Sequence, residues 1–429
     1  MNDPAITNAA SIFRIVESFR RRTAYAGSRG RTGECGACVR ADQDAVPLIP
    51  ADDSAIPDRQ VVSTRKKVDV SDDVDVSDDA ATAERFADRL VASALGAIDL
   101  LAIHLGDRMG WYRALADHGP ADAAELIARA GGDERYAREW LEQQAAAGIL
   151  TVTPDRRFEL PAGAAEVLTD PTSLNYLAPL ARMLAAAAVQ SPALIRAYRD
   201  GGGVGWSEFG TDMREAQSDM NRPWFERRLA ATLTGVPDLA ETLSRPGARA
   251  ADVGFGGGWS TIALARAYPD LTVDGYDIDE PSVDMANRNA AAAGLSDRVR
   301  FHRADAATAL GEQAYDAIFA FECLHDLPHP VPVLAAMRRA LRPGGAVVVM
   351  DEAVAPEFRA PADDVDRLMY GFSLLICLPD GRAHPGSAAT GTVMRHDTLR
   401  RYARSAGFAD IEVLPIEDFG FWRFYRMIP

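Results

Sequence analysis

The sequence predicts an α/β protein in which a mostly helical N-terminal half precedes a parallel sheet with a nucleotide-binding turn. Helical periodicity, interrupted by one hairpin pattern, dominates residues 81–245. In 246–429, apolar strand-like runs alternate with helical segments, the pattern of a sheet covered by helices on both faces. A glycine-rich turn joins the first apolar run to the helix that follows it. We therefore divide the chain into the segments 1–80, 81–170, 171–245 and 246–429.

Length and composition describe a globular protein with an acidic surface. The 429 residues are 48% hydrophobic, enough for two domains and a large core. The net charge of −16 opposes nonspecific attraction to nucleic acid or to an anionic membrane. We find no uninterrupted apolar run of about 20 residues and no secretory signal. The expectation is a cytoplasmic protein without a membrane or nucleic-acid partner.

Residues 1–80 predict a disordered, low-complexity extension. Glycine, proline and charge dominate after a short basic helical pattern at Ile12–Phe19, and the acidic hexapeptide at 68–73 is repeated at 74–79. Cys35 and Cys38 have the spacing of a redox or half-zinc motif, but no second Cys or His pair follows at the usual interval. We therefore expect no metal site.

Residues 81–170 have the element order of a winged helix. A helical pattern over 83–116, broken near Gly106 or Gly110, is followed by helices at 120–130 and 133–147 and a hairpin at 148–160. Winged helices often bind DNA, which requires a basic face. This segment has 9 Lys and Arg against 15 Asp and Glu, so we expect no DNA binding.

Two variable segments are placed to cover a ligand cleft. Residues 171–245 are helical and rich in aromatics, with Gly201–Gly203 as a hinge, and residues 353–394 contain a helix at 366–378 before a loop at 381–391. Pockets favour such junctions between domains. The candidate substrate contacts are Trp206, Asn221, Arg222, Trp224, Phe225 and Tyr370.

The glycine turn lies in the stretch Arg249–Ser260. Its motif, Asp252-x-Gly254-x-Gly256-x-Gly258, lets the backbone turn sharply and approach a ligand closely. Ser260 is the expected N-cap of a helix that ends at Ala267. A dinucleotide fingerprint requires a small residue where Trp259 stands, so pyrophosphate fits poorly.

Further strands follow, each ending in polar residues. Residues 271–279 have the pattern of a strand. Asp277 lies 21 positions after Gly256, close to the spacing at which a carboxylate at the end of a second strand binds ribose hydroxyls, and Asp279 is expected to cap the next helix. A strand at 299–303 leads to Asp305, and an apolar run at 314–321 leads to Glu322. The remaining expected elements are a Leu-Arg-Pro-Gly-Gly turn at 341–345, a strand at 346–350, a helix at 395–406, and an antiparallel pair at 411–416 and 421–427.

From about Ala248 to Met427, these motifs in this order resemble class I S-adenosylmethionine-dependent methyltransferases. The resemblance implies a Rossmann-like seven-stranded sheet and S-adenosylmethionine as cofactor. It places the methionine half of the cofactor on the glycine loop, the ribose on Asp277 and the adenine on Asp305 and Ala306. The cofactor contacts implied in full are Asp252, Gly254, Gly256, Gly258, Asp277, Ile278, Asp305, Ala306 and Phe321. Small-molecule members commonly carry a winged-helix domain that dimerises, which implies a homodimer.

Methyl transfer is an in-line displacement that needs alignment and, for a hydroxyl acceptor, removal of a proton. The residues just past the fourth strand, Glu322, His325 and Asp326, are best placed for this work. Imidazole has a suitable pKa for a base, and either carboxylate can orient it. The alternative is that His325 and Asp326 only begin the next helix and that proximity alone drives transfer.

The leading hypothesis is a small-molecule O-methyltransferase of secondary metabolism. The alternative is a transcriptional regulator that binds S-adenosylmethionine and reads DNA through its winged helix, against which the acidic balance argues. A protein or RNA methyltransferase is a further option, but no Asn-Pro-Pro-Tyr-like motif follows the fourth strand. A nicotinamide enzyme is disfavoured by Trp259.

Overall fold

The computed structural model describes residues 79–429. Residues 97–429 form one compact unit, and the described residues before them, 79–96, belong to another. The predicted extension of 1–80 lies outside the described residues except for its last two positions, and so do its hexapeptide repeat, its basic helix and its cysteine pair. The boundaries at 170 and 245 stay predictions.

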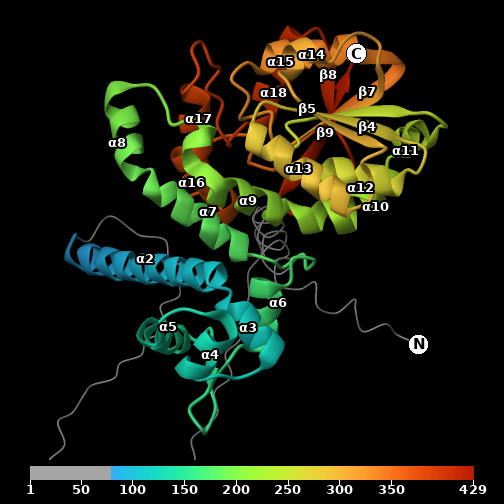
Figure 1. Ribbon diagram of the computed structural model, residues 1–429. Helices are drawn as coiled ribbons and strands as arrows, with labels where there is room; N and C mark the ends of the chain where they lie inside the picture. Colours follow the sequence, from blue (N-terminus) through green and yellow to red (C-terminus); the bar gives the residue numbers. More distant parts are fainter. Residues whose placement is uncertain (1–78) are drawn as a thin grey trace, which may run out of the picture. The chain divides into compact units, whose positions relative to one another are not determined.

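The helices and hairpin of the predicted winged helix form in the expected order (Figure 1). Gly110, with φ 68°, separates the first helix from the second, which confirms the break expected there. Asp122 and Asp133 cap the next two helices through their side chains. The elements are α2 (Asp79–Arg108), α3 (Trp111–His118), α4 (Ala123–Ala130), α5 (Glu134–Ala146), β1 (Thr151–Val152) and β2 (Phe158–Glu159).

Helices also fill the segment between the winged helix and the sheet, as predicted. A kink at Gly210, with φ 78°, bends the longest of them, α9, near its start. The elements are α6 (Ala162–Thr169), α7 (Ala178–Val189), α8 (Ser191–Asp200), α9 (Trp206–Trp224), the π-helical turn η2 (Phe225–Leu229), α10 (Ala230–Thr234) and α11 (Pro237–Ser244).

A seven-stranded sheet with the order β5-β4-β3-β6-β7-β9-β8 forms the C-terminal part. Its first five strands in this order are parallel, and β9 pairs antiparallel with both β7 and β8. This confirms the predicted sheet and its closing antiparallel pair. The strands are β3 (Arg249–Val253), β4 (Thr272–Asp277), β5 (Val299–Arg303), β6 (Tyr315–Phe321), β7 (Leu341–Glu352), β8 (Asp410–Val413) and β9 (Trp422–Ile428).

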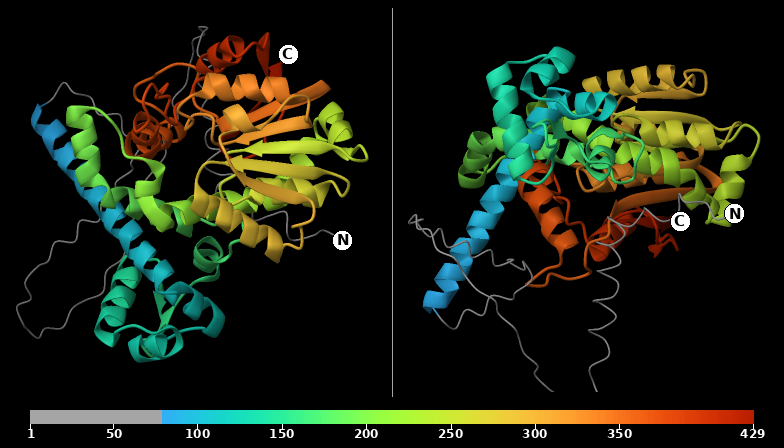
Figure 2. Two further views of the ribbon diagram at one scale, coloured as in Figure 1. Left: turned by 45° about the horizontal axis from the view of Figure 1, so that its top comes forward. Right: turned by 90° about the horizontal axis from the view of Figure 1, so that it is seen from below.

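Helices cover both faces of the sheet, as Figures 1 and 2 show. The helices not yet given are α12 (Trp259–Ala267), α13 (Glu280–Ala292), α14 (Ala306–Ala309), α15 (Pro330–Ala340), α16 (Asp364–Phe372), the π-helical turn η3 (Ser373–Cys377), α17 (Leu378–Arg382) and α18 (His396–Ser405). Neighbouring residues of β6 face opposite cores: Phe319 packs in one cluster and Ile318 in the other. Burial on both faces explains the unbroken apolar run of this strand.

The structure corrects two expectations. The N-cap of α12 is Gly258, because Ser260 instead donates its hydroxyl to Asp252 at 2.6 Å. The Leu-Arg-Pro-Gly-Gly segment belongs to β7, with a register shift opposite Tyr315, and is not a separate turn. Thr82–Arg108 of α2 is interrupted by charged residues but is long and apolar enough by composition to cross a membrane, with a mean hydropathy of 1.5. One such helix is weak evidence for a membrane span.

Candidate cofactor pocket and active site

The loop between β3 and α12 turns on glycines with left-handed backbone. φ is 68° at Gly254, 53° at Gly256 and 76° at Gly258, a region that residues with a Cβ rarely adopt. A Cβ at Gly254 would lie 2.7 Å from the side chain of Cys323, whereas one at Gly256 would project into open space. The loop is therefore a cradle with an open side that bulkier residues would obstruct.

Asp277 ends β4 and holds this loop from the neighbouring strand. Its carboxylate accepts the backbone N–H groups of Gly256 at 3.0 Å and Asp279 at 2.9 Å. Burial raises its pKa above the ordinary value. A carboxylate that accepts two N–H groups keeps further lone pairs. Asp277 can therefore still accept hydroxyl groups from a ligand in the pocket beside it.

Asp252 lies behind the loop. It is fully buried and accepts the hydroxyls of Ser260 and Thr261, both at 2.6 Å, so it fastens β3 to the start of α12. Burial raises its pKa to about 6. It lines neither of the cavities described next. Its predicted contact with the cofactor is not tested by the structure.

A cavity of about 400 Å³ opens at the carboxyl ends of β3, β4 and β5. It brings together Gly254, Asp277, Ile278, Asp305 and Ala306, which are five of the predicted cofactor residues. Its wall also contains residues that the sequence analysis missed, among them Leu327, Pro328, His384 and Pro385. The last two come from the predicted loop at 381–391, and no local pattern reveals where a loop folds back.

A smaller cavity, of about 70 Å³, lies on the other side of Gly254. The loop residues Gly254–Gly257 and Glu322 line it, as do Trp206, Asn221, Phe225 and Phe321. Three predicted substrate residues and the predicted contact Phe321 therefore meet here. Because both cavities include Gly254, the glycine loop is a wall common to the two.

The other predicted substrate residues lie elsewhere. The guanidinium of Arg222 stacks 4.0 Å from the ring centre of Trp259 and pairs with Glu226. Trp224 packs on Trp422. The hydroxyl of Tyr370 accepts a hydrogen bond from Arg395 at 3.0 Å, outside both cavities. Packing and ion pairing thus account for these side chains.

Glu322 follows β6 in a strained conformation. Its φ of 52° is unusual for a residue with a Cβ, and its N–H donates to the carbonyl of Met350 in β7 at 2.7 Å. Its Oε2 accepts Nδ2–H of Asn221, from α9, at 2.5 Å. Burial raises the pKa of Glu322 to about 7, and the nearby His325 partly offsets this effect.

His325 lies in a cluster of carboxylates with only 3% of its side chain exposed. Its Nδ1 is 2.9 Å from Oδ1 of Asp351 and 3.2 Å from Oε2 of Glu352, and its Nε2 is 3.3 Å from Oδ1 of Asp326. Burial by itself lowers the pKa of His325, but these three carboxylates together raise it well above the usual value. The structure therefore brings the predicted His325 and Asp326 together with Asp351 and Glu352.

Asp351 and Glu352, at the end of β7, were missed as site residues. A signal existed, because β6 and β7 are adjacent parallel strands and their carboxyl ends meet at one edge. Pairing with His325 lowers the pKa of Asp351, although burial alone would raise it. Burial raises the pKa of Glu352 well above its usual value, and the nearby His325 partly offsets this effect. Asp351 is thus the ionised partner of His325.

Two triads in this cluster have the residue types of metal ligands. They are His325 with Asp326 and Cys377, and His325 with Asp351 and Glu352. The imidazole nitrogens lie within hydrogen-bonding distance of the carboxylates of Asp351 and Asp326, which accounts for the close approach of these groups. We interpret the cluster as an acid–base group.

Comparisons with known proteins identify both parts of the chain. Residues 250–345 match the family model described as a methyltransferase domain, and residues 96–170 match that of the Rv2258c-like winged HTH domain. A 27-O-demethylrifamycin SV methyltransferase of Amycolatopsis mediterranei is 34% identical over 37% of this chain and 57% of its own length. A ubiquinone biosynthesis O-methyltransferase of Methylococcus capsulatus is 36% identical over 24% of this chain and 43% of its own length. The chain spans about half the length of such curated relatives.

Solved structures resemble nearly the whole described fold. The mitomycin 7-O-methyltransferase MmcR has a TM-score of 0.59 at 23% identity, covering 81% of this chain and 99% of that one. Human N-acetylserotonin methyltransferase, solved with SAM, has a TM-score of 0.61 at 18% identity, covering 82% and 99%. Together with the matched domains, these likenesses show that the chain has the class I methyltransferase fold preceded by a winged helix-turn-helix domain.

Proposed function

We propose that the protein transfers a methyl group from S-adenosylmethionine to a hydroxyl of a small molecule. The observation that carries this proposal is the pair of cavities that share Gly254. The larger one presents Asp277 and Asp305, and the smaller one leads along the glycine loop to Glu322, the first residue of the acid–base segment. The relatives and solved neighbours named as small-molecule O-methyltransferases support it.

The residues of the two cavities together suit the cofactor, with Gly256 lining the smaller one and Asp277 and Asp305 the larger. The open side of the loop at Gly256 leaves room for the methionine half, Asp277 keeps lone pairs for ribose hydroxyls, and Asp305 supplies a carboxylate for the adenine amine. When bound, the cofactor supplies an electrophilic methyl group on a sulfonium. The protein holds the cofactor and the acceptor in line, which removes most of the entropic cost of the encounter.

His325 serves in this proposal as the base that takes the acceptor's proton. Asp351 holds its Nδ1, and Nε2, which lies 3.3 Å from Oδ1 of Asp326, is the nitrogen that takes the proton. His325 is 3% exposed and lines neither cavity, so the proposal requires the hydroxyl to displace Asp326, which is 35% exposed, from Nε2. The three carboxylates that raise the pKa of His325 make the imidazole a stronger base and leave less of it deprotonated at neutral pH.

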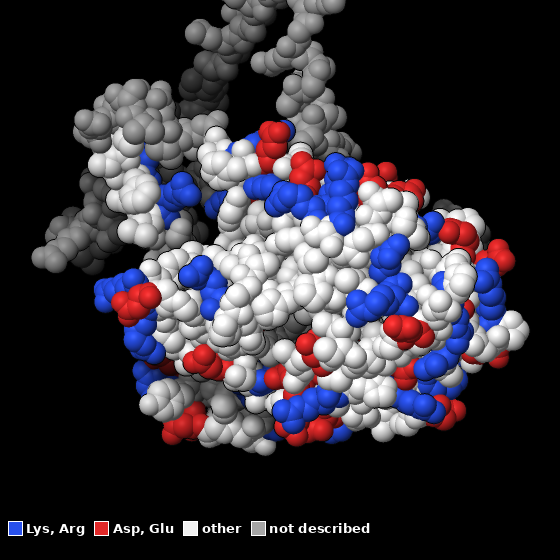
Figure 3. Space-filling model, turned by 90° about the horizontal axis from the view of Figure 1, so that it is seen from above, with Lys and Arg blue, Asp and Glu red and all other residues white. Residues whose placement is uncertain are grey.

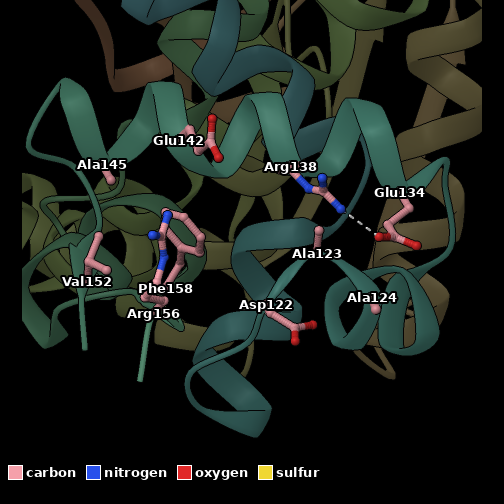
Figure 4. Close-up of a pocket in the computed structure, with 10 residues that line it drawn as sticks. All are labelled: Asp122, Ala123, Ala124, Glu134, Arg138, Glu142, Ala145, Val152, Arg156 and Phe158. Carbon is pink, nitrogen blue, oxygen red and sulfur yellow. Dashed lines mark hydrogen bonds and ion pairs between the residues drawn. The ribbon is translucent and has the colours of Figure 1, made fainter. Parts of the chain in front are cut away.

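The mixed charge of the winged-helix domain favours a structural role for it over DNA binding. A cavity of about 700 Å³ lies between α4, α5 and the hairpin (Figure 4), and its charged lining is Asp122, Glu134, Arg138, Glu142 and Arg156. Arg138 is already paired with Glu134 at 2.9 Å. Figure 3 shows the opposite face, the molecule seen from above Figure 1, where arginines are also interspersed with acids and form no continuous basic band. Phosphate binding requires such a band.

We further propose that α2 mediates a homodimer. The helix carries large apolar side chains that are 48–62% exposed: Phe86, Leu90, Val91, Leu95, Ile98, Leu101 and Leu105. An exposed apolar stripe of this length is typical of a protein interface. Its repeat at three- and four-residue intervals suits packing against a second helix of the same kind.

Transfer of a labelled methyl group tests the proposed activity. The protein is incubated with S-adenosylmethionine carrying a trideuterated methyl group and a panel of phenolic and polyketide-like hydroxy compounds. Mass spectrometry should find products heavier by one labelled methyl on oxygen, and none with His325→Ala. Cofactor binding without transfer to any compound, together with a DNA mobility shift, would instead support the regulator.

A further inference from the structure

Glu322 is an acidic residue that lines the smaller cavity, where the nearby cation, Arg214, is already paired with Asp279. It shares the smaller cavity with Gly254–Gly257. The cation that also lines this cavity, Arg214, makes two hydrogen bonds to Asp279, at 2.6 and 2.8 Å. The carboxylate of Glu322 therefore faces the glycine loop without a Lys or Arg partner among the described residues.

The backbone holds Glu322 in this position at a cost. Its left-handed φ of 52° lies in a region that residues with a Cβ rarely adopt. The N–H bond to Met350 in β7 and the Asn221 amide on α9 fix the residue from two sides. Strain of this kind persists where the side chain has a role that an ordinary strand end would not provide.

We infer that Glu322 makes the pocket selective for the charge of the cofactor, so that it holds the positively charged sulfonium and releases the neutral thioether product. This inference rests on the proposed function, because it requires S-adenosylmethionine to bind at the glycine loop. S-adenosylmethionine and S-adenosylhomocysteine share the adenosine and the amino-acid groups. Their difference in affinity therefore isolates the charge on sulfur from the contributions of Asp277 and Asp305.

Every group that faces Glu322 bears on its titration. Its own segment supplies His325, β7 supplies Asp351, β9 supplies the indole of Trp422, and α9 supplies the neutral Asn221. Burial, the largest of these effects, raises the pKa of Glu322 to about 7. A cation that binds beside it stabilises the ionised form, so binding near or below pH 7 displaces a proton.

Isothermal titration calorimetry tests the inference on the intact protein. At pH 8, S-adenosylmethionine should bind about tenfold more tightly than S-adenosylhomocysteine, a modest effect for opposite charges in a partly buried site. Sinefungin, which carries a positively charged amine in place of the sulfonium methyl, should have an affinity closer to that of S-adenosylmethionine than to that of S-adenosylhomocysteine. The preference should decline as the pH falls below 7. Titrations at pH 6.5 in two buffers of different ionisation enthalpy should show proton release with the cationic ligands only.

Variants separate charge from structure. Glu322→Gln keeps an acceptor for Asn221 and should bring the two affinities within about twofold of each other, whereas Glu322→Asp should keep the preference. Asp380→Asn is the matched control, because the pKa of Asp380 is also about 7 by burial and its carboxylate is not among the lining of the cavity. That variant should keep both the preference and the proton release.

Two failures are distinguishable. If neither S-adenosylmethionine nor S-adenosylhomocysteine binds, the proposed function itself fails. If both bind with equal affinity to the wild type, or if Glu322→Gln retains the preference, the proposed function stands and the role of Glu322 is wrong.

Discussion

At the scale of single residues, the site depends on how burial and neighbouring charge oppose each other at His325. Burial favours the neutral imidazole, and Asp326, Glu352 and Asp351 favour the cation more strongly. The result is a base whose pKa lies above that of a free imidazole, so that it needs a higher pH to act than a free imidazole does. The type and position of this residue are apparent from the sequence. Its carboxylate partners on β7 are not, because their distance from it depends on strand pairing.

The first prediction concerns the pH dependence of turnover. Because the deprotonated imidazole is the active form and its pKa is raised, kcat/KM should increase with pH through a midpoint above 6.5. Asp351→Asn removes one cause of the shift, so the midpoint should move to lower pH and kcat should fall by about 10²-fold, the lower end of acid–base effects. Methylation rates between pH 5.5 and 10 check both outcomes. A pH-independent wild-type rate would show that proximity alone drives transfer.

A second prediction concerns the fully buried Asp252. Its pKa of about 6 exceeds the unfolded value of 3.8, so the folded state favours the protonated form. The stability that this provides is present below pH 3.8 and is lost as the pH rises to about 6. Asp252→Asn keeps an acceptor for Ser260 and Thr261 but does not titrate.

Urea unfolding at pH 4 and pH 7 measures this effect. The stability of the variant relative to wild type should rise between the two pH values by up to about 3 kcal/mol, which is the shift of 3.8 to 6 converted at 1.36 kcal/mol per unit. If the free energy of unfolding changed equally between pH 4 and pH 7 in the variant and the wild type, the raised pKa of Asp252 would be contradicted.

At the scale of elements, α9 joins the helical half to the cofactor loop. One face carries Asp212, Glu215 and Asp219, which pair with Arg108 of α2 or Arg182 of α7. Another set of its residues reaches the site: Arg214 pairs with Asp279, Ser218 accepts from Trp259 at 3.0 Å, and Asn221 donates to Glu322. The sequence predicts this helix and its polar residues. It does not predict which residue meets which partner, because those partners are up to 107 positions away.

A third prediction tests this contact between α9 and the loop. A Cβ at Gly257 would lie 1.9 Å from Oγ and 2.8 Å from Cβ of Ser218. Gly257→Ala should therefore weaken cofactor binding by about 5- to 150-fold, since a clash between two packed segments costs about 1–3 kcal/mol. The second substitution Ser218→Ala removes the closer contact and should restore part of the affinity. If Gly257→Ala alone bound S-adenosylmethionine as tightly as the wild type, the proposed close packing of α9 against the glycine loop would be contradicted.

At the scale of the whole molecule, the order of strands creates the site. β3 has β4 on one side and β6 on the other: the chain runs from β3 through β4 to β5 in one direction and then crosses back from β5 to β6 on the opposite side of β3. Loops at such a switch point diverge and leave a crevice. Alternating apolar and helical segments were enough to predict the sheet and its antiparallel end. The helices of the two segments 171–245 and 353–394 were predictable, but the residues by which these segments line the cavities were not. For this reason His384 was missed and Tyr370 was placed in the pocket.

A fourth prediction concerns association through α2. Ile98→Glu or Leu105→Glu should convert the proposed dimer to a monomer, because each places a charge within the apolar stripe. Val413→Glu, at a comparably exposed position on β8, is the matched control and should leave the mass unchanged. Sedimentation velocity gives the masses. A wild-type protein that sediments as a monomer, or dimers that survive both stripe substitutions, would contradict this interface.

The measurement that tests the central claim most directly is calorimetric titration of the full chain with S-adenosylmethionine and S-adenosylhomocysteine, with NAD as control. The account predicts micromolar binding of the first two ligands, no binding of NAD, and loss of binding in Asp277→Ala, whose carboxylate holds the loop and faces the larger cavity. Binding of NAD, or binding of neither adenosyl ligand, would contradict the assignment of this cavity. Unchanged affinity of the Asp277→Ala variant would remove Asp277 from the site.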